Sequence, residues 1–151
     1  YLKEEWYRFF TSVFIHFDLG HIFGNMIGLW GGGRIIEKEA GHLKMMVCYF
    51  FSAIMGSLFV CLMADSGSIT VGASGGVLGV IASAFIFMRK KGQNKQQTLG
   101  ILFCLVYNLY NTFKYPEISV GGHVGGIIGG LLAGLVLFGK RRENDDQSGM
   151  F

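Results

Sequence analysis

One serine and two histidines are the residues of this chain whose types and surroundings best suit chemistry. Ser74 lies in the stretch GASGG, His123 in GGHVGG and His21 in LGHIFGNM, all within apolar segments. A serine hydroxyl is a weak nucleophile alone, and a neutral imidazole within reach is its usual activator. These residues indicate acyl-transfer chemistry, provided that the fold brings the serine and a histidine together.

The composition limits the folds that could position them. Of the 151 residues, 51% are hydrophobic and only 15% are charged, whereas soluble domains carry about 25% charged residues. The net charge of +3 is too small and too dispersed to suggest a nucleic-acid partner. The three cysteines lie at wide spacings in apolar runs, which indicates neither a disulfide framework nor a zinc knuckle.

Long intervals without charge explain this composition. A bilayer core of about 30 Å needs about 20 helical residues, and five intervals reach that length, of which the first holds one charge, Asp18. We therefore expect an all-α polytopic membrane protein, a bundle with five transmembrane helices. The expected spans are about 9–33, 45–64, 72–88, 97–113 and 118–139.

The basic residues predict the orientation, because they are retained on the cytoplasmic side. Ten of the 13 follow the first, third and fifth spans: Arg34, Lys38, Lys44, Arg89, Lys90, Lys91, Lys95, Lys140, Arg141 and Arg142. Residues 140–151 are then a charged cytoplasmic tail, and residues 1–8 belong to an external loop. An external N-terminus without a signal peptide indicates that at least one span precedes this chain. We expect a multi-pass protein of a prokaryotic cell membrane.

Three polar side chains reach similar depths in this arrangement. We count 1.5 Å per residue upward from the basic residue at the cytoplasmic end of each span. Ser74 then lies about 22 Å above that end, His123 about 25 Å and His21 about 20 Å. A histidine inside a membrane is a functional candidate by default, since it is costly unless it faces a polar interior.

Glycines in the same spans predict how these side chains could meet. Glycines recur four residues apart in the first, third and fifth spans, and such flat faces let helix backbones approach closely. Packing of these faces could bring Ser74 within hydrogen-bonding distance of His123, and Gly75 and Gly126 are expected to be structural residues of the site. Gly72 and Gly75 also permit a tight backbone that leaves the Ser74 amide free to face an oxyanion.

His21 and Asn25 are candidate donors to the same oxyanion. They lie one helical turn apart and share a face. No carboxylate is expected at their depth, because Asp18 lies one turn nearer the interface and Glu117 lies in a loop. The expected arrangement is a Ser/His pair that keeps the nucleophile, base and oxyanion donors of a triad without its acid.

These motifs resemble those of a known family. The stretches WYRFFTSVFIHFDLGHIFGNM, GASGGVLG and GGHVGGIIGG resemble, in this order, the rhomboid intramembrane serine proteases. The resemblance implies a six-helix core, of which this chain holds five helices, around a water-filled cavity. It implies that Ser74 is the nucleophile and His123 the base, that His21 and Asn25 stabilise the oxyanion, and that His16 is structural. It also implies transmembrane protein substrates, contact with membrane lipids, and no metal or cofactor.

The resemblance extends to the surroundings of the site. Span 97–113 and the loop 111–122 would be the substrate gate and cap, with Trp30 and Phe103 as the expected contact between the first and fourth spans. Many members carry an aromatic residue four positions after the serine, packed on the catalytic histidine. Leu78 stands at that position here.

Other function classes stay open at this point. A catalytically inactive scaffold or chaperone of the same fold would not need Ser74 and His123. A metal hydrolase could use His16, His21 and His123, but residues five apart on a helix diverge by about 140°, whereas zinc helices use positions i and i+4. A transporter would show intramembrane charges or broken helices aligned between repeats.

Overall fold

The computed structural model describes residues 5–63 and 72–139, and within these residues it contains helices and connecting loops but no strand. The elements are α1 (Arg8–Thr11), a 3₁₀ turn η1 (Ser12–Phe14), α2 (Leu19–Ala40), α3 (His42–Met63), α4 (Ser74–Lys91), α5 (Lys95–Lys114) and α6 (Val120–Phe138). The all-α fold predicted from the charge-free intervals is confirmed. The predicted tail at 140–151 lies outside the described residues.

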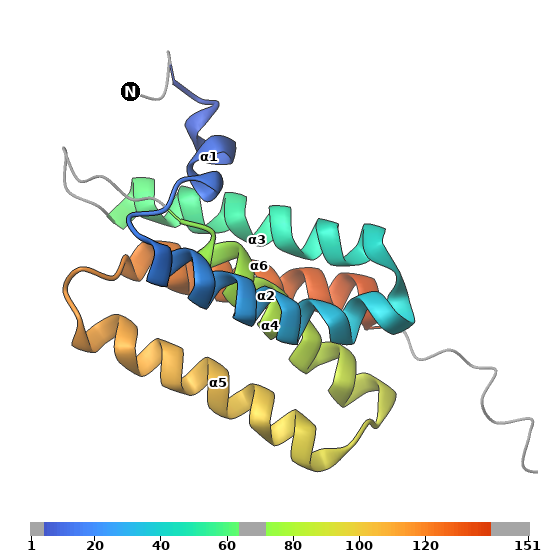
Figure 1. Ribbon diagram of the computed structural model, residues 1–151. Helices are drawn as coiled ribbons and strands as arrows, with labels where there is room; N and C mark the ends of the chain where they lie inside the picture. The colour runs from blue at the N-terminus through green and yellow to red at the C-terminus, as the bar shows by residue number, and fades with distance from the viewer. Residues whose placement is uncertain (1–4, 64–71, 140–151) are drawn as a thin grey trace, which may run out of the picture.

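Helix α4 lies at the centre of the bundle. Twelve of its 18 residues are buried, and it packs against α2, α3, α5 and α6 (Figure 1). Helices α3 and α6 also pack closely on each other, whereas α5 runs along the outside and contacts mainly α4. The core is therefore a group of α3, α4 and α6, with α2 and α5 added to its surface.

Glycines bring α4 and α6 into backbone contact. A Cβ added at Gly75 would lie 2.7 Å from the carbonyl oxygen of Gly122, and one at Gly79 would lie 2.7 Å from that of Gly126. In the other direction, a Cβ at Gly126 would collide with the backbone of Gly75. The close helix approach predicted from the glycine spacing is present between α4 and α6, since only residues without a side chain allow it.

The first helical segment differs from the predicted span at 9–33. The chain forms α1 and η1, becomes extended at Ile15, and starts a new helix at Leu19. Asp18 is the N-cap of α2, and its carboxylate accepts a hydrogen bond of 2.8 Å from the backbone N–H of His21. A capping carboxylate stabilises a helix start, so the apolar run before it does not continue the helix.

Helices α3, α4 and α5 extend past the predicted spans into polar or charged residues at one end or both, whereas α6 lies within its predicted span 118–139. Helix α4, for example, continues to Lys91 rather than 88, and α5 begins at Lys95. By length and composition, two helices of the described residues are apolar enough to cross a membrane, namely α3 and α6.

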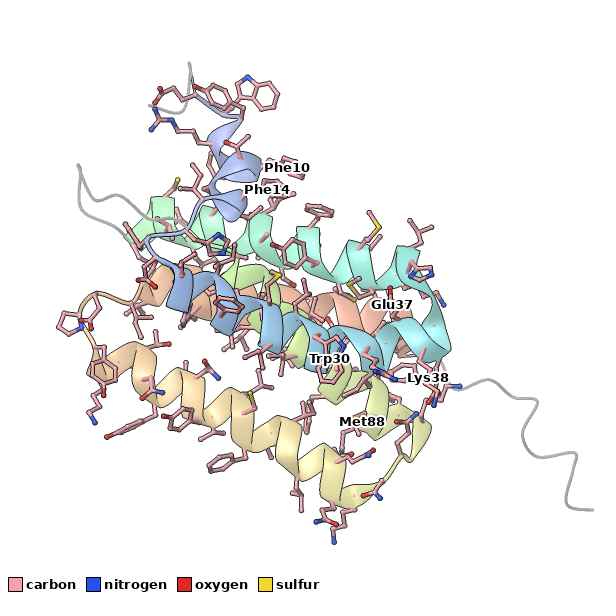
Figure 2. The ribbon with its side chains drawn as sticks, in the orientation of Figure 1. Phe10, Phe14, Trp30, Glu37, Lys38 and Met88 are labelled. Carbon is pink, nitrogen blue, oxygen red and sulfur yellow. The ribbon has the colours of Figure 1, made fainter. Side chains whose placement is uncertain are left out.

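Helices α2, α4 and α6 run in the same direction through the bundle (Figure 1). Glu37, Lys38 and Met88 gather at the end where α2 and α4 finish, away from Phe10 and Phe14 (Figure 2). The first residues of α2, α4 and α6 consequently lie at the opposite end from Arg89, Lys90 and Lys91 in the last turn of α4.

Trp30 and Phe103 do not form the contact expected between the first and fourth spans. Trp30 on α2 is 67% exposed and lies 5.5 Å from the guanidinium of Arg34. Phe103 on α5 is 71% exposed and stacks on Tyr107 of its own helix. Hydrophobicity suggested that these large side chains would fill a helix interface, but both face outward.

Candidate active site

Ser74 and His123 lie within hydrogen-bonding distance at the N-terminal ends of two neighbouring helices. The distance between Ser74 Oγ and His123 Nε2 is 2.9 Å. Ser74 is the first residue of α4, and His123 lies in the first turn of α6. Their backbones are held together by the glycine contacts between these helices, one and three residues away at Gly75 and Gly126.

The position of Ser74 also presents its backbone amide. The first N–H groups of a helix have no acceptor within that helix. The amide of Ser74, the first residue of α4, therefore has no acceptor within its helix.

The second ring nitrogen of His123 has a partner that sequence reasoning missed. Thr112, in the last turns of α5, places its Oγ1 2.7 Å from His123 Nδ1. Its side chain is only 1% exposed. One signal was present in the sequence: Asn108 and Thr112 lie four residues apart, so that two polar residues share one face of an apolar helix.

His21 lies against the turn that precedes Ser74. A Cβ added at Gly72 would lie 2.6 Å from Cε1 and 2.8 Å from Nε2 of the His21 ring, and Gly72 has φ +121°. The backbone N–H of Gly72 donates a hydrogen bond of 3.1 Å to the carbonyl of Ser12. Both the backbone conformation and the histidine require a glycine here.

Asn25 is buried one turn after His21 on α2. It is 6% exposed, and its side-chain Nδ2 has no hydrogen-bond partner in the described part of the chain. A buried amide nitrogen without an acceptor is unusual in a folded protein. It is a donor available to a group that enters the site.

His16 lies outside the helix that carries His21. Its ring packs edge-on against the ring of His21, with centroids 5.1 Å apart, and its Nε2 is buried without a partner in the described residues. The helical spacing argument against a metal site therefore does not apply to this pair. Within residues 5–63 and 72–139, no three His, Cys, Asp or Glu side chains lie close enough to share a metal ion.

The comparison with known protein families identifies the family to which the chain belongs. The sequence model of the rhomboid domain matches residues 3–140, which is nearly the whole chain. The chain belongs to the rhomboid family. The family predicted from the motifs is confirmed, and with it the character of an integral membrane protein.

Related rhomboids include proteases and a protein described as inactive. Rhomboid protease GlpG of Salmonella paratyphi A is 30% identical over 136 residues, which are 82% of this chain and 45% of the relative. Rhomboid protease GluP of Bacillus subtilis is 29% identical over 124 residues, 81% of this chain and 24% of the relative. Inactive RHOMBOID-like protein 8 of Arabidopsis thaliana is 35% identical over 105 residues, 68% of this chain and 30% of the relative. The chain thus spans less than half of the length of each of these rhomboids.

The rhomboid motif positions can now be placed in the structure. Ser74 and His123 are brought together directly, and His21 lies beside the turn that leads to Ser74. Leu78, at the position where many rhomboids carry an aromatic residue, is 3% exposed and belongs to an apolar cluster on α4. An aliphatic side chain cannot hydrogen-bond to an imidazole, whereas Thr112 can.

Proposed function

We propose that this rhomboid is an intramembrane serine endopeptidase in which Ser74 is the nucleophile and His123 the general base. The observation that carries the proposal is the 2.9 Å distance between Ser74 Oγ and His123 Nε2. A nucleophile and base within about 2.6–3.2 Å, with the base oriented by a third group, is the geometry of an activated serine.

The reaction is the hydrolysis of a peptide bond through an acyl-enzyme. Ser74 Oγ attacks the carbonyl carbon while its proton passes to His123 Nε2. The resulting imidazolium gives that proton to the leaving amine as the C–N bond breaks. Water then attacks the ester carbonyl, loses a proton to His123, and releases the acid as the proton returns to Ser74 Oγ.

Three groups are proposed to stabilise the oxyanion of the tetrahedral intermediate. They are the backbone N–H of Ser74, the amide Nδ2 of Asn25 and the ring of His21. The unpartnered and buried state of Asn25 Nδ2 supports this role, because such a donor strengthens its bond as the oxygen becomes negative. His16, packed against His21, would orient that ring.

The protein would act on transmembrane segments of other membrane proteins, surrounded by membrane lipids and without a metal or cofactor. The relatives named rhomboid proteases support this substrate class. The basic residues near the C-terminal ends of α2 and α4 favour a cytoplasmic location for that end and for the C-terminal tail. The proposed location is the cell membrane of a prokaryote.

A rhomboid-like scaffold without catalytic activity is the second candidate. The relative named an inactive protein, at 35% identity, favours it. The two candidates differ in what they require of Ser74, since a scaffold functions without the hydroxyl.

Cleavage of a transmembrane substrate in liposomes tests the proposal. The wild-type protein should produce two fragments from a co-reconstituted single-span substrate, and Ser74→Ala and His123→Ala should produce none. Ser83→Ala is the matched control on the same helix and should cleave. Absence of cleavage by the wild type over a panel of substrates, or continued cleavage by Ser74→Ala, contradicts the assignment.

A further inference from the structure

Among the described residues, Thr112 of α5 is the side chain that makes a hydrogen bond with Nδ1 of His123, the ring nitrogen that does not face Ser74. We propose that Thr112 is a positioning residue that fixes the tautomer of His123, with the proton on Nδ1 and the lone pair of Nε2 directed at the Ser74 hydroxyl. This inference rests on the proposed function of Ser74 and His123 and adds a third residue to it.

The number of hydrogens on Thr112 determines the direction of its hydrogen bonds. Thr112 Oγ1 lies 2.7 Å from the carbonyl oxygen of Asn108 as well as 2.7 Å from His123 Nδ1. A carbonyl oxygen only accepts, so the single hydroxyl hydrogen of Thr112 is donated to Asn108. Towards His123 the hydroxyl can then only accept, and Nδ1 must carry the hydrogen.

The same reasoning extends to the other ring nitrogen. A neutral imidazole has one N–H and one lone pair. If Nδ1 carries the hydrogen, Nε2 has the lone pair and accepts the hydrogen bond from Ser74 Oγ at 2.9 Å. This is the tautomer that general-base catalysis needs, because Nε2 must be free to take the serine proton.

The surroundings of Thr112 stabilise its hydrogen bond to His123 Nδ1, and with it this tautomer of His123. Its side chain is 1% exposed, so water has little access to replace its bond to Nδ1. Its hydroxyl is also held by the back-bond to the carbonyl of Asn108 on the same helix.

No carboxylate shares this role in the described residues, where His123 makes side-chain hydrogen bonds to Ser74 and Thr112. After Nε2 takes the serine proton, the Nδ1–H of the imidazolium keeps its acceptor and its bond to Thr112 strengthens. A hydroxyl supplies this without placing a negative charge inside the membrane.

Exchange of Thr112 tests the proposal, with Thr98 as the matched control. Thr112→Val keeps the shape of the side chain but removes the acceptor, whereas Thr112→Ser restores it. Thr98 lies on the same helix, is 7% exposed and back-bonds to Asn94, but it does not contact His123.

The expected loss is intermediate. Replacing the carboxylate of a Ser-His-Asp triad lowers kcat about 10⁴-fold, and hydrogen bonds between neutral groups have about half the strength of charged ones. Thr112→Val should therefore lower kcat about 10- to 100-fold with little change in KM. Thr112→Ser and Thr98→Val should stay within about threefold of the wild type.

A spectroscopic measurement separates positioning from a structural defect. The chain has four histidines, so ¹⁵N-labelled histidine gives a spectrum in which the signals of His123 are assigned by their loss in His123→Ala. We expect Nδ1–H in the wild type and in Thr112→Ser, and a mixture of both tautomers in Thr112→Val. Nε2–H in the wild type, or an unchanged tautomer in folded Thr112→Val, overturns the proposal.

The two proposals fail in different ways. If Ser74→Ala still cleaves substrate, the proposed function is wrong, but the tautomer of His123 can still be read from the spectrum. If the tautomer does not depend on Thr112 while Ser74→Ala is inactive, the dyad stands and the positioning role is wrong.

Discussion

The interface of α4 with α6 and the attachment of α5 contribute to one site by different means. Between α4 and α6, glycines let the backbones touch, so Gly75 and Gly126 leave no room for a Cβ. Helix α5 instead packs on α4 through side chains such as the buried Leu105, and a Cβ at Gly100 on its exposed face would meet nothing within 4 Å. It lies on the outside and reaches His123 through one buried threonine.

This difference separates two requirements of the proposed chemistry. The backbone contacts set the distance between Ser74 and His123, and helix positions held in this way cannot change without unpacking the core. The hydrogen bond from α5 sets the orientation of the imidazole. We therefore expect substitutions at the α4–α6 contact to unfold or separate the site, and substitutions in α5 to affect its chemistry more than its stability.

The largest effect is expected for Gly126→Ala. Its new Cβ would collide with the backbone of Gly75, and such overpacking costs about 3 kcal/mol, the upper part of the usual range, because neither backbone can move aside. Thermal unfolding in detergent micelles measures the loss.

Gly100→Ala on α5 is the matched control. Alanine there should stabilise the helix by up to about 1 kcal/mol, since it favours helix without creating a contact. Equal stability of the two variants would contradict the backbone contact between Gly126 and Gly75.

Gly72→Ala should affect activity more than stability. Its Cβ would meet the ring of His21 at 2.6 Å, and displacing one oxyanion donor lowers kcat about 10²-fold or more. Turnover of a transmembrane substrate in liposomes, measured with the unfolding midpoint, separates the two effects.

The control for this variant is Gly41→Ala. Gly41 also has positive φ, at +87°, but no atom lies within 4 Å of an added Cβ. Both variants carry a backbone penalty of about 1–3 kcal/mol for positive φ, so only Gly72→Ala should lose turnover. If the two lose turnover equally, His21 has no role in the reaction.

The smallest effect is expected for Ser83→Ala. Ser83 is fully buried on α4, and its Oγ donates a hydrogen bond of 2.7 Å to the carbonyl of Gly130 on α6. Its loss should cost about 1 kcal/mol and leave turnover unchanged, because the glycine contacts still hold the helices. A loss as large as that of Gly126→Ala would mean that side-chain bonds, not backbone contact, join α4 and α6.

The sequence predicts the parts of this structure that depend on regular spacing. Ser74 and His123 could be placed at one depth because each lies at a countable distance from a basic helix end, and the glycine spacing predicted the contact that joins them. The break before Leu19 was not predicted, because it depends on capping by Asp18 in competition with a continuous apolar run. Thr112 was missed because its role depends on how α5 is rotated about its own axis. Hydrophobicity does not determine that rotation, because large apolar side chains such as Phe103 and Tyr110 also line the exposed face of α5.

The attachment site of a fluorophosphonate probe tests the central claim most directly. The wild-type protein is incubated in liposomes with the probe, and the modified residue is located by mass spectrometry of its peptides. We predict one adduct, on Ser74, absent in His123→Ala because the hydroxyl then lacks its proton acceptor. An adduct on another serine, or undiminished labelling of Ser74 in His123→Ala, would contradict the account.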